Sequence, residues 1–354
     1  MSLAECIFFY NPTLRKVNIM YFLTRFLSLS SAFVLLLGFL VSGNLQAATA
    51  VAEPPIQVKA LNDYLIYFFD GRRPAERYAK DWNWYDDAAM KLGVGTYVIH
   101  QGDTAVVYDT FTSVAQAKWV RNYMEKMGVK KFSVVHSHWH LDHIAGDAVY
   151  DDSDVITTKA TRDALFKQKT DIESGKLWGL PPIKPTRIPN VTFVGKKAMK
   201  VGDIPFELRQ INIHSLDHCV IYFPKDKILL SGDTLEDTLT YMVEVEGLPK
   251  HIKNLKKMRT WDVAKIYPNH GDPSVVMNGG YDKTLIDATI SYITKMLKHS
   301  HDKDFLNAKM EDYIGESVKK GWVHVFEPYR EVHTQNLKLV QDYWKKKPLP
   351  VIKN

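Results

Sequence analysis

The sequence predicts a layered α/β domain, because strand-like apolar runs alternate with segments of helical periodicity. Two such runs, Tyr97–His100 and Thr104–Tyr108, flank Gln101-Gly102-Asp103, which is a hairpin signal. Apolar residues recur at nearly helical spacing over Val114–Met127. A second helical pattern, Leu248–Met258, leads into another strand-like run. We therefore expect layers of strands and helices in one fold.

The composition fits a globular protein. A chain of 354 residues that is 45% hydrophobic can bury a large core, and it contains no internal repeat or low-complexity tract. Its formal net charge of +6 is modest, and the basic residues are spread among acidic ones, so we expect no nucleic-acid partner. The run Lys345-Lys346-Lys347 is interpreted as a solvated tail.

One short stretch concentrates the potential metal ligands. The segment His138-Trp139-His140-Leu141-Asp142-His143 directly follows the apolar run Phe132–Val135 and contains three histidines and one aspartate. Imidazole nitrogens and carboxylate oxygens are ligands that zinc and related divalent metals accept. The alternative interpretation is a His-rich surface loop that binds metal only by accident.

Three later candidates stand where an apolar run gives way to a loop. His214 follows Phe206–Ile213, Asp233 ends the run that begins at Leu229, and His270 follows the strand-like start of Ile266–Gly271. The sheets of α/β proteins collect functional groups at such strand ends. The pattern therefore predicts a metal site at one edge of a sheet.

Taken in order, these residues resemble the signature of the metallo-β-lactamase superfamily. That signature has an Asp after an early strand, His-x-His-x-Asp-His, a later His, a Gly-Asp and a final His, matched here by Asp109, His138–His143, His214, Asp233 and His270. The match extends over about residues 60 to 275. It implies an αββα four-layer sandwich in which two sheets pack face to face.

The resemblance also implies two zinc ions per chain and a role for each matched residue. The first site would be formed by His138, His140 and His214, the second by Asp142, His143 and His270, and Asp233 would bridge the two. The expected nucleophile is a metal-bound hydroxide, since zinc lowers the pKa of bound water to about 7. We take Asp142 and Asp233 as the catalytic carboxylates, while Asp109 would hold the ligand loop by hydrogen bonds. His136 and His218 lie outside the pattern and are interpreted as core or supporting residues.

The substrate is less constrained, because this fold and its metals serve several reactions. We expect a hydrolase, and the export signal described below favours the β-lactam amide bond as its target, which would confer antibiotic resistance. The alternative is a lactone, thioester or phosphoester hydrolase. Asp233 permits it equally, since well-known β-lactamase subgroups carry Cys or Ser there. Glu236 also stands where one subgroup has a Lys that pairs with the drug's carboxylate. A non-catalytic metal-binding or redox protein is disfavoured by the complete ligand set.

The loop Gly175–Pro189 is the expected source of substrate contacts. Its glycines and prolines break regular structure, and Trp178 offers an apolar tip that suits a lid. Arg187 is the candidate partner for a substrate carboxylate, with Lys184 or Lys176 as alternatives.

The two ends of the chain carry further predictions. Residues 1–50 read as a signal peptide, because Phe26–Val41 is apolar and Ala48-Thr49-Ala50 suits signal peptidase, so we expect export to the periplasm. A membrane anchor is the alternative, but a spanning helix needs about 20 apolar residues, so no stable membrane insertion is expected after cleavage. Met20 is an alternative start, because the residues before it make a long n-region.

We expect a catalytic domain over residues 51–278 and a helical extension over residues 279–354 packed on it. Three helical patterns in the extension support this division, namely Thr284–Leu297, Asp302–Lys319 and Tyr329–Trp344.

Overall fold

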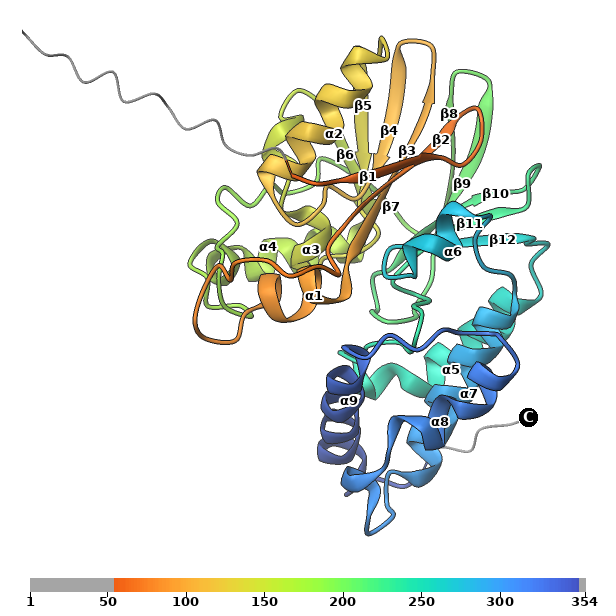
Figure 1. Ribbon diagram of the computed structural model, residues 1–354. Helices are drawn as coiled ribbons and strands as arrows, with labels where there is room; N and C mark the ends of the chain where they lie inside the picture. The colour runs from red at the N-terminus through yellow and green to blue at the C-terminus, as the bar shows by residue number, and fades with distance from the viewer. Residues whose placement is uncertain (1–53, 350–354) are drawn as a thin grey trace, which may run out of the picture. The chain divides into compact units, whose positions relative to one another are not determined.

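The computed structural model describes residues 54–349, and within them the chain forms two β-sheets with helices around them (Figure 1). The predicted signal peptide, residues 1–50, lies outside the described residues. Within residues 54–349, no helix combines the length and the apolar character that a membrane crossing requires.

The first sheet has seven strands in the order of the sequence. Its first four strands are antiparallel neighbours, and the connections from the fourth to the seventh are parallel. The predicted hairpin is confirmed, since Gln101 and Thr104 are paired across its tip. The strands are β1 (Gln57–Ala60), β2 (Leu65–Asp70), β3 (Val94–Gln101), β4 (Thr104–Tyr108), β5 (Lys131–Val135), β6 (Asp154–Thr158) and β7 (Val191–Phe193).

The second sheet has five strands in the order β12-β11-β10-β9-β8. Within this sheet only β11 and β12 are parallel neighbours, and the chain between them contains the helix α5 (Leu248–Arg259). The strands are β8 (Lys196–Val201), β9 (Ile204–Gln210), β10 (Cys219–Phe223), β11 (Ile228–Gly232) and β12 (Lys265–Pro268).

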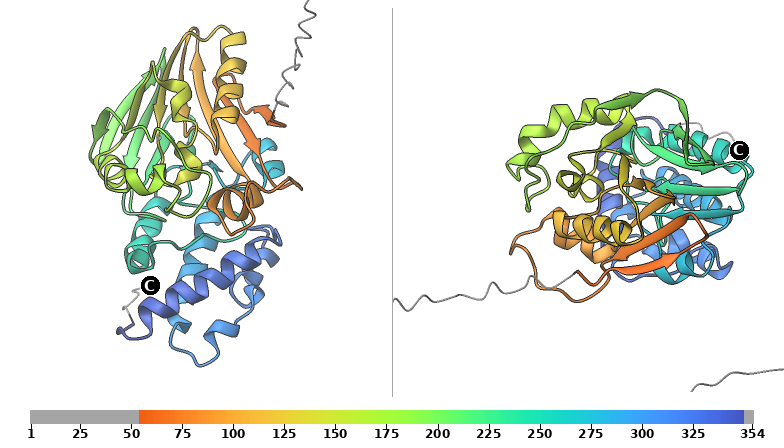
Figure 2. Two further views of the ribbon diagram at one scale, coloured as in Figure 1. Left: turned by 90° about the vertical axis from the view of Figure 1, so that its left-hand side faces the viewer. Right: turned by 90° about the horizontal axis from the view of Figure 1, so that it is seen from above.

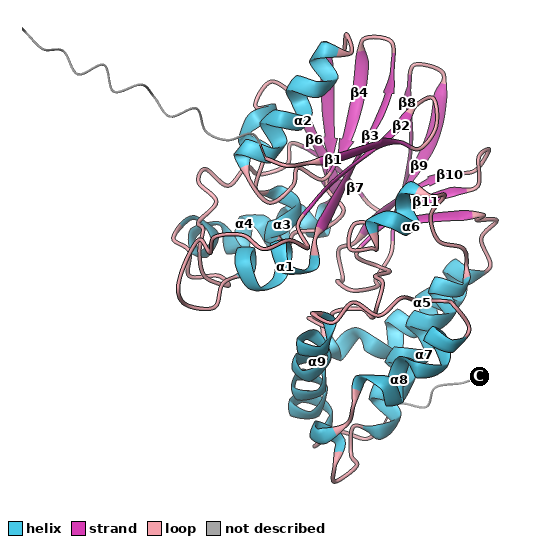
Figure 3. Ribbon diagram, viewed as in Figure 1, coloured by secondary structure: helices cyan, strands magenta, loops and turns pink. Residues whose placement is uncertain are grey.

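Figure 3 shows α1, α2, α3 and α4 beside the first sheet, and α5, α7, α8 and α9 gathered in one group below the sheets. Figure 2 shows this group from two further sides. Within this group α7 contacts α5, α8 and α9. The α-helices are α1 (Met90–Leu92), α2 (Val114–Lys126), α3 (Leu141–Ile144), α4 (Lys159–Glu173), α5 (Leu248–Arg259), α6 (Pro273–Met277), α7 (Thr284–His299), α8 (Met310–Lys319) and α9 (Tyr329–Trp344).

Strand β2 shows how the layers are held together. Its side chains alternate between two buried clusters, because successive residues of a strand point to opposite faces. Leu65, Tyr67 and Phe69 belong to the core that also contains residues of the second sheet. Ile66 and Phe68 belong to the core beneath α2 and α4. A strand that is buried on both faces usually has a continuous apolar sequence. Strand β2 fits this rule, since its residues 65–69 are all apolar or aromatic.

The helices after residue 279 share the inner core with the strands. Tyr292 and Met296 of α7 and Leu337 and Val340 of α9 are buried in the same cluster as the strand residues of both sheets. This cluster therefore extends without interruption from the sandwich into the C-terminal helices.

One predicted helix is shorter than expected. The pattern Asp302–Lys319 predicts a single helix, but the α-helix begins only at Met310, after a separate 3₁₀ turn at Phe305–Asn307. Between them Ala308 and Lys309 have extended backbone. Asp and Asn side chains compete with helical hydrogen bonds, which explains why this stretch, rich in both, forms turns instead.

Candidate metal centre

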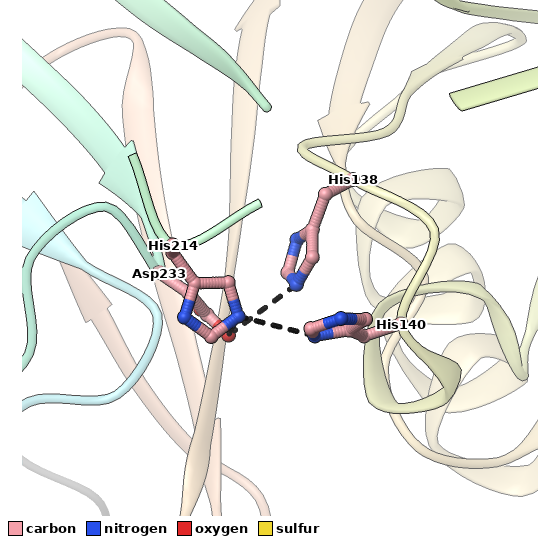
Figure 4. A group of neighbouring side chains, drawn as sticks. All are labelled: His138, His140, His214 and Asp233. Carbon is pink, nitrogen blue, oxygen red and sulfur yellow. Dashed lines mark hydrogen bonds and ion pairs between the residues drawn. The ribbon is translucent and has the colours of Figure 1, made fainter. Parts of the chain in front are cut away.

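The seven predicted ligand residues meet where strands of the two sheets end. His138 and His140 follow β5, His214 follows β9, Asp233 follows β11 and His270 follows β12. Asp142 and His143 lie in the short helix α3. They form two groups whose potential ligand atoms lie within 4.8 Å of one another, His138, His140, His214 and Asp233 in one and Asp142, His143, Asp233 and His270 in the other. Asp233 is common to both groups, and Figure 4 shows the first of them.

The turn that presents Asp233 requires a glycine before it. Gly232 has a φ of 55°, a conformation that residues with a Cβ rarely adopt. A Cβ at this position would lie 2.4 Å from Nε2 of His218 and 2.9 Å from Cβ of Ser137. The chain can therefore turn from β11 into the site only because this residue has no side chain.

Nitrogen and oxygen atoms converge on the centre of each group. His140 Nδ1 lies 3.1 Å from His214 Nε2, and His143 Nε2 lies 3.1 Å from Asp233 Oδ2. His270 Nε2 is 3.1 Å from Asp142 Oδ2. Within the described residues, His138 Nε2 and Asp233 Oδ1 are buried without a hydrogen-bond partner. Because buried polar atoms are rarely left unpaired, this convergence suits divalent cations.

Asp109 contacts one ligand residue, His143, and the segments that carry two others. Its side chain is fully buried, and its Oδ1 accepts a hydrogen bond from the backbone N–H of Ser137 at 2.7 Å. Its Oδ2 lies 2.9 Å from His143 Nδ1 and accepts from Asn269 Nδ2 at 2.6 Å. The carboxylate thus touches one ligand residue and the neighbours of two others, and it belongs to neither metal-ligand group.

Backbone carbonyl groups orient two further imidazoles. Nδ1 of His214 lies 3.1 Å from the carbonyl oxygen of Tyr241, and Nδ1 of His270 lies 2.7 Å from that of Gly93. A ring nitrogen that faces a carbonyl must carry the proton, so Nε2 is the nitrogen that each ring would offer to a metal.

Burial and the neighbouring groups set different charges on the ligand residues. Burial and the neighbouring imidazoles lower the pKa of His138 and His140 well below the usual value, which keeps both rings neutral. Burial alone would raise the pKa of Asp142, but His143 and His270 lower it to about 2. The same two histidines hold the pKa of Asp233 far below its usual value against the effect of burial. Against the effect of burial, the neighbouring carboxylates raise the pKa of His143 and His270 well above the usual value, so these two rings hold a proton that a bound metal would displace. Neutral imidazoles and ionised carboxylates are the forms that bind metals.

A pocket of about 190 Å³ opens onto these residues and includes Asp142 and Asp233 in its lining. Trp178 lines it too, with its ring centroid 5.1 Å from that of His140. Glu236 also belongs to the lining, where it is buried. The sequence carried no signal for several other lining residues, namely Trp82, Trp84, Tyr241, Val243 and Leu339.

The geometry does not support a substrate contact for Arg187. This residue is absent from the pocket lining, and its guanidinium donates hydrogen bonds to the carbonyl groups of Tyr150 and Ser153. Lys176 and Lys184 do not line the pocket either. The loop therefore contributes Trp178 to the pocket, whereas Arg187 binds backbone carbonyl groups outside it.

The two histidines outside the signature lie in the core beside the site. His136 is buried, and its Nε2 is 2.8 Å from Asp147 Oδ1. His218 stacks on His138 with ring centroids 4.6 Å apart. Neither histidine belongs to a metal-ligand group.

Residues 91–270 match the family model of the metallo-beta-lactamase superfamily, which is half of the chain. The chain therefore belongs to this superfamily of hydrolases, and the resemblance that its motifs predicted is confirmed. The mixed α/β fold with two sheets agrees with this membership.

Known proteins resemble the chain at low identity. It is 23% identical over 186 residues to a beta-lactamase-like protein 2 homolog of Caenorhabditis elegans, which covers 51% of this chain and 56% of that protein. It is 24% identical over 186 residues to the 2,4-dinitroanisole O-demethylase subunit alpha of a Nocardioides species, covering 50% of this chain and 53% of that protein. The chain thus spans about half the length of the curated relatives it matches.

Solved structures share the fold. A metallo-beta-lactamase from Pontibacter korlensis is similar with a TM-score of 0.50 at 19% identity, covering 68% of this chain and 99% of that one. The DIM-1 metallo-beta-lactamase is similar with a TM-score of 0.52 at 16% identity, covering 69% and 99%. At such identities the likeness shows the fold alone.

Proposed function

We propose that this protein is a hydrolase that binds two divalent metal ions and cleaves an acyl bond in a small molecule. The observation that carries the proposal is the arrangement of seven ligand residues in two groups that share Asp233 at a pocket. Each group offers only nitrogen and oxygen atoms, which is the donor set that zinc accepts. When bound, such a pair of metals polarises the bond to be cleaved and activates water.

The protein's own residues would hold and orient this centre. Asp109 and the carbonyl groups of Gly93 and Tyr241 fix imidazole rings so that their free nitrogens face inward. Asp142 and Asp233 supply negative charge and line the pocket, so we propose them as the catalytic carboxylates. The pocket between the ligands and Trp178 would bind the substrate and exclude water from it.

The predicted export signal and the superfamily favour the β-lactam amide bond as the substrate, but the lining of the pocket argues against it. Esters, lactones and thioesters are the second candidate, and a specific observation supports them. Glu236 is buried in the pocket lining, and no Lys or Arg of the described residues lines the pocket beside it. A β-lactam carboxylate would therefore have no side-chain cation to pair with.

Hydrolysis by the zinc-replete full chain, compared with the chelated protein, tests this function. Carbapenems, cephalosporins, a lactone, a thioester and 4-nitrophenyl esters make up the substrate panel. We expect chelator-sensitive turnover of at least one of them with kcat/KM of about 10⁴ M⁻¹s⁻¹ or more, the lower end for ordinary enzymes. His140→Ala should abolish this turnover. A metal-replete protein that leaves the whole panel intact would overturn the proposal.

We also propose that the protein acts in the periplasm after removal of residues 1–50. The support is the apolar stretch Phe26–Val41 followed by Ala48-Thr49-Ala50. Cell fractionation followed by N-terminal sequencing of the mature protein tests this. We expect a periplasmic protein that begins near Val51, and an unprocessed cytoplasmic chain would contradict it.

A further inference from the structure

The part of the pocket that does not bind metal is almost wholly apolar. Besides the predicted ligands and Glu236, every lining residue is aliphatic or aromatic, and none is Lys or Arg. The larger ones are Trp82, Trp84, Trp178, Tyr241, Leu92, Leu141 and Leu339. The part of a substrate that does not react would therefore contact carbon, and burying it there would be favourable only for apolar groups.

Two residues of this apolar wall, Trp82 and Leu339, lie outside the segment that matches the family. Trp82 precedes residues 91–270, and Leu339 belongs to α9, which follows them. Helix α9 is tied to the loop after Asp233, since Tyr241 Oη donates to Gln335 Oε1 at 2.7 Å. The shape of the pocket is thus a property of this chain's own flanking segments.

Glu236 adds the only acidic group of the lining that is not a predicted ligand. It is 1% exposed, and its oxygens accept hydrogen bonds from the N–H of Tyr241 at 2.8 Å and from Tyr329 Oη at 3.1 Å. Within residues 54–349 no Lys or Arg forms an ion pair with it, and the nearest basic atom is His214 Nδ1 at 3.8 Å. A substrate carboxylate at this part of the pocket would be buried beside the carboxylate of Glu236, with no Lys or Arg side chain to pair with.

Resting on the proposed function, we propose that the pocket selects an uncharged ester or lactone with an apolar acyl chain, and that Glu236 is a specificity-determining residue that excludes carboxylate-bearing substrates. In the reaction, water adds to the acyl carbon, the C–O bond breaks, and a carboxylic acid and an alcohol are released. The apolar chain lies against Trp82 and Leu339.

Two esters of the same acyl length test the selection. 4-Nitrophenyl hexanoate carries a neutral chain, whereas 4-nitrophenyl hydrogen adipate ends the same chain in a carboxylate, and both release 4-nitrophenol. With the zinc-replete full chain, we expect kcat/KM to be about 100-fold or more higher for the hexanoate, because a buried unpaired carboxylate is strongly disfavoured. Similar values for the two esters, or faster turnover of the adipate, would overturn the proposal.

Variants assign the selection to named side chains. At about pH 8.5 Glu236 carries its charge, although burial raises its pKa to about 7. At that pH, Glu236→Gln keeps an acceptor for the N–H of Tyr241 and removes the charge, so the preference for hexanoate should fall about tenfold, through a lower KM for the adipate ester. Glu244→Gln makes the same change in the same loop, outside the pocket lining, and should leave the preference unaltered. Leu339→Ala should lower kcat/KM for hexanoate about tenfold, and more than for 4-nitrophenyl acetate, because an apolar contact is lost. An unaltered preference in Glu236→Gln would remove this residue from the proposal.

A binding measurement separates this inference from the proposed function. Three tryptophans line the pocket, so their fluorescence reports ligands that cannot be hydrolysed readily, such as hexanamide and adipamic acid. We expect hexanamide to bind more tightly than adipamic acid even in the chelated protein. If no substrate is hydrolysed but this order holds, the proposed function fails and the pocket assignment stands. If hydrolysis occurs and the order is reversed, the pocket assignment fails alone.

Discussion

Asp109→Asn tests whether the metal centre depends on the carboxylate beneath it. In the native protein Oδ2 of Asp109 meets His143 Nδ1 at 2.9 Å and Asn269 Nδ2 at 2.6 Å. An Asn whose oxygen still accepts from Ser137 N–H would turn its own N–H₂ toward both donors. Two hydrogen bonds to a charged group would be lost, at about 1.5–3 kcal/mol each, so we expect the free energy of unfolding to fall by about 3–6 kcal/mol.

The effect on metal affinity is the more specific outcome. Loss of such a supporting partner typically weakens metal binding by about 10- to 100-fold, because the ring of His143 would no longer be held in its orientation. Competition with a chromogenic chelator measures the affinity, and urea unfolding followed by circular dichroism measures the stability.

Asp147→Asn is the matched control for this experiment. Asp147 is also buried and contacts a histidine, but its partner is His136, which belongs to neither metal-ligand group. We expect its metal affinity to equal that of the unmodified protein. The reasoning is refuted if Asp109→Asn binds metal as tightly as Asp147→Asn does.

Two further predictions concern stability. Gly232→Ala should lower the free energy of unfolding by about 2–5 kcal/mol, because it adds an unfavourable φ and an overlap with His218. The control Gly102→Ala should lower it by only about 1–2 kcal/mol, because Gly102 has a φ of 60° but no atom within 4 Å of the new Cβ. Equal losses for the two variants in urea unfolding would contradict the overlap at Gly232. The hydrogen bond to Asp237 raises the pKa of His324. Its stabilising effect is therefore fully present below the pKa of the unfolded chain and is lost as pH rises through the folded pKa. His324→Gln should accordingly differ more from the native protein at about pH 5.5 than at about pH 9 in thermal unfolding, and a difference that does not change with pH would count against this ion pair.

The ligand residues could be predicted from the sequence because each stands at the end of an apolar run, and strand ends meet at one edge of a sheet. Asp109 also ends a strand, but its supporting role is what the resemblance to the superfamily implies, and the strand-end reasoning alone did not assign it. Asn269 received no assignment, although this residue directly precedes His270, because an Asn in a loop has many ordinary uses. Its role depends on the contact with Asp109, from which it is separated by 160 residues.

The pocket wall was harder to predict for a related reason. Trp82 and Leu339 lie in segments whose local patterns describe only a loop and an amphipathic helix, and their common position depends on how α9 docks. Arg187 shows the limit of reading charge from a loop sequence. The sequence favours it as a partner for a substrate carboxylate, but its guanidinium donates hydrogen bonds to two backbone carbonyl groups instead. The charge of a side chain can be read from the sequence, but the group that it binds can be identified only from the fold.

Helix α9, which completes the pocket wall, is made after every one of the predicted ligand residues. All seven metal-ligand residues precede Gly271, whereas Tyr329 and Leu339 follow it by more than fifty residues. The order of synthesis therefore separates two parts of the proposed chemistry. The predicted ligand residues are made well before the surface that we propose selects the substrate. A chain that is released early, or clipped before Tyr329, would retain every ligand and lose the partner of Glu236 together with one edge of the wall. Premature termination should consequently relax selectivity before it removes the capacity to bind metal.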